Sequence, residues 1–163
     1  MKLRFEIKAL AVALSLLMTI ATPAGSQSID FPKYAVPVYV GVRAQPNFAG
    51  DGARFAKMRT RIREGFAANA IAAGHYTVIQ IGCGSSCTLN LIGDVRSGHI
   101  VEFPVGREEY PGVQIITDPK SRLFTAKWGN IAFTTCRTRL YSFDGLRFTQ
   151  IGKDEFQNKS CFD

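Results

Sequence analysis

The first 27 residues place the strongest constraint on how this 163-residue chain folds, because they indicate the redox compartment in which it does so. Three cations precede a predominantly apolar run over residues 9–21, and small residues follow it. That order is typical of an export signal peptide, and the run is shorter than the roughly 20 residues of a membrane-spanning helix. We therefore predict a signal peptide over residues 1–27, no transmembrane anchor, and a single periplasmic or secreted domain over residues 28–163.

From His75 onward the apolar residues alternate with a period of two, which predicts antiparallel strands. The clearest hairpin pairs residues 76–82 with residues 88–92. Ile79 and Leu91 then lie on one face, which we predict to be buried. The connection Gly84-Ser85-Ser86 brings Cys83 opposite Cys87, at a spacing that a disulfide tolerates.

The chain has four cysteines, Cys83, Cys87, Cys136 and Cys161, and all lie beyond the predicted signal peptide. Cysteines of small exported domains usually pair, and four cysteines allow three connectivities. Because the hairpin favours Cys83 with Cys87, we predict that Cys136 pairs with Cys161.

The remaining strands follow from turn signals. The turn at residues 94–98 leads into a strand over residues 99–105, and we predict the register that sets Leu91 beside Val101; the alternative sets Asn90 against Phe103. The other predicted strands are residues 36–42, at a sheet edge because prolines surround it, and residues 113–117, 123–128, 131–142 and 146–151.

Residues 51–65 predict an amphipathic helix. Asp51 is suited to cap its start, and Phe55, Ile62 and Phe66 recur at helical spacing. Gly65 is the predicted end, with extension to Gly74 as the alternative. The rest of the circumference carries the densest positive charge of the chain, contributed by Arg54, Lys57, Arg59, Arg61 and Arg63.

These elements predict an α+β fold. One amphipathic helix packs on a twisted antiparallel β-meander sheet of about six to eight strands, and the whole is disulfide-stapled.

Removal of residues 1–27 would lower the formal net charge from +7 to +5, so the domain stays basic. A basic surface favours an anionic envelope component or an acidic protein as partner. No zinc-finger, helix-turn-helix or aromatic RNA-binding pattern is present, so we do not expect a nucleic acid partner.

Catalytic patterns are weak. Cys83 and Cys87 have one residue more between them than a C-x-x-C redox motif, and they lie on strands instead of a helix start. Hydrolysis by His75 or by paired carboxylates is an alternative, and the available carboxylates are Glu102, Glu108, Glu109, Asp118 and Asp144. We find no metal-ligand spacing and no cofactor motif, and therefore expect neither.

Three segments together resemble a group of small exported bacterial proteins. They are Arg59-Thr60-Arg61-Ile62-Arg63-Glu64-Gly65, Gly74-His75-Tyr76 and Gly82-Cys83-Gly84-Ser85-Ser86-Cys87. The group is known to us only as uncharacterised, so the resemblance implies an exported location and no particular activity.

The sequence thus predicts a noncatalytic binding or inhibitory module. Its candidate surface comprises Arg59, Arg61, Arg63 and His75, with an anionic partner. The alternatives are an envelope hydrolase that uses His75 or paired carboxylates, a thiol-disulfide protein that uses Cys83 and Cys87, and a purely structural envelope component.

Overall fold

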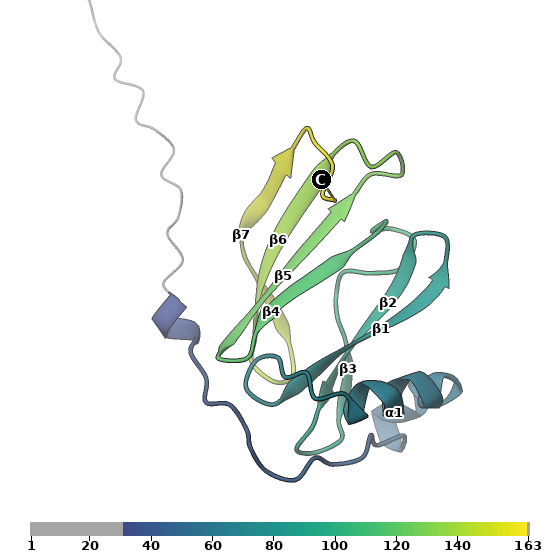
Figure 1. The fold of residues 1–163 in the computed structure, drawn as a ribbon, viewed down its shortest axis with the longest axis vertical. Helices are drawn as coiled ribbons and strands as arrows, with labels where there is room; N and C mark the ends of the chain where they lie inside the picture. The colour runs from purple at the N-terminus through teal and green to yellow at the C-terminus, as the bar shows by residue number, and fades with distance from the viewer. Residues whose placement is uncertain (1–30, 163) are drawn as a thin grey trace, which may run out of the picture.

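The computed structural model describes residues 31–162, so the predicted signal peptide lies outside the described residues (Figure 1). Two 3-10 helices precede the α-helix: η1 (Phe31–Tyr34) and η2 (Gly50–Met58), followed by α1 (Arg59–Ala67). The strands are β1 (Tyr76–Gly84), β2 (Cys87–Asp94), β3 (Ile100–Glu102), β4 (Gln114–Asp118), β5 (Ser121–Gly129), β6 (Cys136–Phe143) and β7 (Phe148–Gln157).

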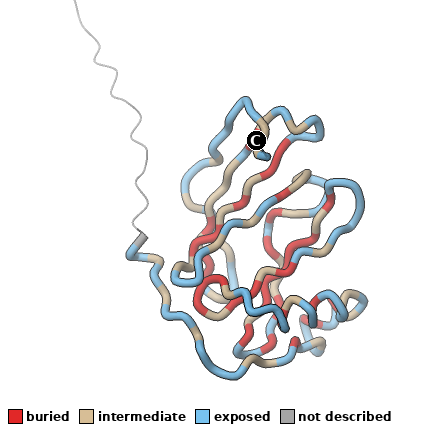
Figure 2. Tube along the Cα trace, in the orientation of Figure 1, coloured by how far each residue is buried: buried red, intermediate tan, exposed pale blue. Residues whose placement is uncertain are grey.

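The seven strands form two antiparallel sheets, in the orders β1-β2-β3 and β4-β5-β6-β7. The predicted α+β class is confirmed, but the strands are divided between two sheets where we expected one meander. A single helix covers only a few strands, so folding the second sheet back over the first buries the face that the helix leaves open. Buried residues, red in Figure 2, accordingly concentrate where these layers meet.

The first apolar cluster lies between the helix and the three-stranded sheet. Phe55, Ile62 and Phe66 form the buried stripe predicted for the helix, and they pack against Ile79 and Leu91. This confirms both the amphipathic helix and the buried face of the β1–β2 hairpin.

The second cluster lies between the two sheets. Phe103, which follows β3, packs edge-to-face on Tyr141 of β6 and Phe148 of β7, with ring centroids 5.5 and 4.9 Å apart. Phe124 of β5 and Phe143 of β6 complete the aromatic centre. Burial of these rings holds the sheets together.

The helix differs from the prediction at both ends. Its first half is the 3-10 helix η2, whose N-cap is Ala49; no side chain caps it, so Asp51 lies within the first turn and does not cap it. Its second half continues past Gly65 to Ala67. A Cβ at Gly65 would lie 2.5 Å from Cγ1 of Ile79, so this glycine permits close packing on β1 instead of ending the helix.

The β2–β3 register is the alternative that the sequence analysis ranked second. Leu91 pairs with Glu102, and Phe103 N donates to Asn90 O at 2.9 Å. The turn is one residue longer than predicted, because Asp94 N donates to His99 O. In this register Phe103 packs in the aromatic centre between the sheets.

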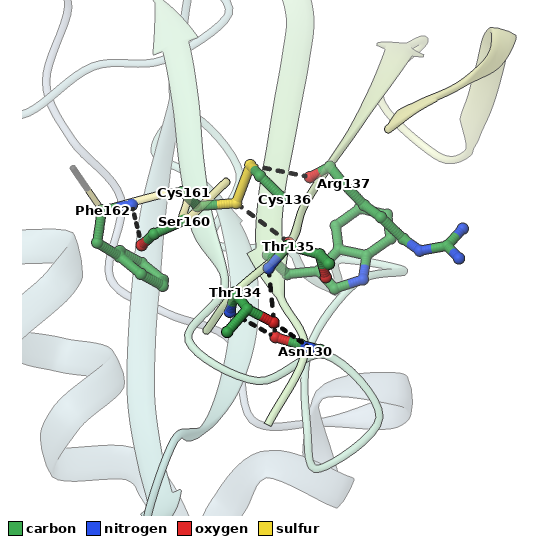
Figure 3. Close-up of a disulfide and its surroundings, with 9 residues drawn as sticks. Asn130, Thr134, Thr135, Cys136, Arg137, Ser160, Cys161 and Phe162 are labelled. Atoms are coloured by element: carbon green, nitrogen blue, oxygen red, sulfur yellow. Dashed lines mark hydrogen bonds between the residues drawn. A yellow bond between two sulfur atoms is a disulfide. The ribbon is translucent and has the colours of Figure 1, made fainter. Parts of the chain in front are cut away.

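Two predicted strands are wrong in whole or in part. Residues 36–42 form no strand; Ala35 makes one bridge to Ser121, and Tyr39 N donates to Gly74 O outside any ladder. The predicted strand over residues 131–142 begins only at Cys136. Before it, Asn130 Oδ1 accepts a hydrogen bond from Thr134 N at 2.8 Å, which closes a turn (Figure 3).

Both predicted disulfides are confirmed. Cys83 and Cys87 have Cα atoms 5.1 Å apart; Cys83 lies in a bulge, since Gly84 is the residue that pairs with Cys87. Cys136 on β6 is bonded to Cys161 beyond β7, with Cα atoms 4.8 Å apart (Figure 3). The second bond ties the chain after β7 to the four-stranded sheet.

Candidate functional site

The basic surface, as we name it, consists of the exposed cations on η2 and α1. Phe55, Ile62 and Phe66 direct the opposite side of this helical segment into the core, so its cations point to solvent. The members of the basic surface are Arg54, Lys57, Arg59, Arg61 and Arg63. Three of them, Arg59, Arg61 and Arg63, belong to the candidate binding surface predicted from the sequence.

Arg59 and Arg63 are one helical turn apart and both lie over the ring of Phe48. Their guanidinium carbons are 5.7 and 5.8 Å from the ring centroid. Arg59 Nε also donates to Ala56 O at 3.1 Å. An aromatic face orients a guanidinium without neutralising it, so both groups keep their charge available to an anion.

Arg61 is the one member of the basic surface with an ion pair among the described residues. Its Nη1 lies 3.1 Å from Glu64 Oε2, and both side chains are more than half exposed. Such a pair contributes little to stability and exchanges readily with an external anion.

His75 lies directly before β1. Its Nε2 is 3.8 Å from Asp94 Oδ1, and its carbonyl accepts from Val95 N. Its ring centroid lies 4.1 Å from that of Tyr76, with the two planes tilted by 35°. Burial lowers the pKa of His75 below its usual 6.5, against the opposite effect of Asp94 and with a further lowering by Arg96. None of these contacts of His75 involves Arg59, Arg61 or Arg63.

Asp94, the carboxylate beside His75, is committed to a turn. Its Oδ1 accepts from Arg96 N and its Oδ2 from Ser97 Oγ, both at 2.8 Å. His75 Nε2 is buried with no hydrogen-bond partner in the described structure. The pair thus has the residue types of an acid–base site, but both carboxylate oxygens of Asp94 are engaged by its own turn.

Most of the carboxylates considered for hydrolysis have structural partners. Asp118 and Asp144 accept backbone hydrogen bonds within their own turns, and those from Arg147 and Leu146 lower the pKa of Asp144. Glu102 Oε1 lies 2.7 Å from Arg107 Nη2. Glu102, Arg107 and Glu109 line a groove of about 360 Å³.

Two further grooves open on the described surface, and His75 lines neither of them nor the groove beside Glu102. One, of about 610 Å³, runs between Arg54 of the basic surface, His99 and the exposed Leu146. The other, of about 550 Å³, is lined by Trp128, Arg137 and the loop around Ile131.

Sequence reasoning missed an ion pair and an apolar loop. Arg139 of β6 and Asp154 of β7 are hydrogen-bonded, and Arg139 lies 5.1 Å over the ring of Trp128.

Val40 and Val42 project into solvent at 96% and 90% exposure. The alternating valines of this segment predict a strand, whereas the structure shows an exposed loop.

The Cys83–Cys87 bond lies at the tip of the β1–β2 hairpin.

Within residues 31–162 no group of three or more histidine, cysteine, aspartate and glutamate residues is placed to hold a metal ion. The helices of the same part of the chain are all too short or too polar to cross a bilayer.

Comparison with models of known protein families, with curated proteins and with solved structures finds no match for this chain. The functional argument therefore depends on the geometry and charge described above.

Proposed function

We propose that this protein is a noncatalytic binding or inhibitory module, and that the basic surface binds an anionic partner in the periplasm or outside the cell. The observation that carries the proposal is the pair Arg59 and Arg63, oriented over Phe48 with no carboxylate partner within residues 31–162. Guanidinium groups held in this way recognise phosphate, carboxylate or sulfate oxygens.

The two disulfides support the proposed location, because such bonds persist in oxidising compartments. The order of charged, apolar and small residues over residues 1–27, and the resemblance to small exported bacterial proteins, point the same way. Amino-terminal sequencing of the purified protein tests this, since export predicts a chain that begins close to residue 28.

The proposal is tested with the triple variant R59A/R61A/R63A on an anionic chromatography matrix. We expect the salt concentration needed for elution to fall sharply, because three charges that contact the matrix are lost. The melting temperature should change little, since all three side chains are exposed.

The matched control is R147A/K153A/K159A, which removes three exposed positive charges from the β6–β7 region. Its net charge equals that of the test variant. Equal loss of retention in both variants would show that net charge alone binds the matrix, and would overturn the proposed surface.

A further inference from the structure

An exposed apolar loop lies next to the basic surface in the described chain. We name residues 38–42 the valine loop; its tips are Val40 and Val42, at 96% and 90% exposure. Large aliphatic side chains exposed to this degree, two residues apart, are a feature of surfaces that contact an apolar phase.

The valine loop is held in place by its Tyr39 side chain and by the turn that precedes β1. Tyr39 N donates to Gly74 O at 2.8 Å, and Tyr39 Oη donates to Val42 O at 3.0 Å. The Tyr39 ring lies against Gly41 so closely that a Cβ at this position would overlap it. The valines are therefore presented by an ordered turn, which lowers the entropic cost of inserting them.

Cations adjoin this loop on several sides. Arg43 follows it directly and is partly buried, with Nε donating to Phe66 O at the end of α1. Ala44 N donates to Val95 O, which brings Arg96 alongside, where Arg96 also lies 3.9 Å from Asp94 Oδ1. Val36 N donates to the carbonyl of Lys120 on the other flank. The same segment continues to Phe48, on which Arg59 and Arg63 lie.

We propose that the valine loop and the basic surface together dock on an anionic phospholipid surface. This rests on the proposed function and names its partner. Cations are attracted to the headgroups while apolar side chains enter the acyl boundary, a combination that neither a soluble polyanion nor a neutral bilayer satisfies. Figure 1 shows the segment between η1 and η2 reaching α1 at the same end of the molecule.

The test is co-flotation of the purified protein with vesicles of phosphatidylcholine, alone or mixed with phosphatidylglycerol. We expect binding to the mixed vesicles only. The variant V40S/V42S should bind them roughly tenfold more weakly, and R59A/R63A weaker by about fivefold for each arginine. The control I131S, which alters a residue 87% exposed between β5 and β6, should bind as the unaltered protein does.

Retention on the anionic chromatography matrix separates this inference from the proposed function. V40S/V42S should be retained like the unaltered protein, because its charges are intact. If the arginines govern retention but V40S/V42S still floats normally, or the unaltered protein does not float, the membrane inference is wrong and the anionic-binding function stands. If the arginines do not govern retention, the proposed function itself fails.

Discussion

Asp154 accepts two hydrogen bonds from Arg139, at 2.7 Å from Nε to Oδ1 and at 2.6 Å from Nη2 to Oδ2. Both side chains are about four-fifths buried, and the guanidinium also lies over Trp128. This two-point contact joins β6 to β7 where the ladder between them is interrupted. It stabilises the strand that precedes Cys161.

The substitution Asp154→Asn should destabilise the fold by about 2 kcal/mol, because a charged hydrogen-bond acceptor is lost while Arg139 stays partly buried. Urea unfolding at neutral pH measures the change. A loss below about 0.5 kcal/mol would show that water replaces the carboxylate without cost.

Acid should weaken the same contact. The hydrogen bonds from Arg139 hold the pKa of Asp154 below its usual 3.8. A depressed carboxyl pKa contributes stability that is complete above the unfolded value, and this contribution is lost as the pH falls below 3.8 through the folded pKa. Stability curves against pH for the unaltered protein and Asp154→Asn should therefore converge in acid; parallel curves would contradict this assignment.

His75 should show a pH effect in a higher range. Because burial lowers its folded pKa below 6.5, the unfolded chain takes up a proton that the folded chain resists as the pH falls through 6.5. The unaltered protein should thus lose stability over that interval relative to His75→Gln. Urea unfolding on both sides of pH 6.5 measures the difference, which should be absent if the ring is freely hydrated.

The two disulfides should differ in their contribution to stability. The Cys136–Cys161 bond spans 25 residues and the Cys83–Cys87 bond 4, so loop-closure entropy predicts contributions of about 3.5 and about 2 kcal/mol. Paired serine substitutions, compared by urea unfolding, measure both. The reverse order would indicate that the hairpin bond acts by more than loop closure.

Gly65 should resist substitution although it lies in a helix. Alanine would gain about 1 kcal/mol in helix propensity, but its Cβ would crowd Ile79 at 2.5 Å and cost about 1–3 kcal/mol. We expect a net loss in Gly65→Ala. Gly82→Ala is the control, because nothing lies within 4 Å of its added Cβ. Equal stability of both variants would show that α1 shifts away from β1.

Local features were predictable because neighbouring residues determine them. The stripe of Phe55, Ile62 and Phe66 follows from helical spacing alone, and the Cys83–Cys87 bond from the short connection between its two strands. The same is true of the exposure of the arginines in the basic surface.

Tertiary features were not predictable in this way. Alternation shows that one face of a strand is buried, but not whether a helix or a second sheet covers it, so the division into two sheets was missed. The β2–β3 register depended on Phe103 reaching Tyr141 and Phe148, which come from the other sheet. The partnership of Arg139 with Asp154 depends on the irregular pairing of β6 with β7, which places the two side chains together.

Each covalent cross-link joins residues within or beside one sheet: Cys83–Cys87 in the first, Cys136–Cys161 in the second. All four cysteines are consumed in this way, so no disulfide bridges the two sheets. Reducing agents would loosen each sheet separately, whereas the sheets are held against each other by apolar packing and by the single chain segment over residues 103–113. Denaturant would therefore separate the packed faces of a fully oxidised molecule while both disulfides stay intact.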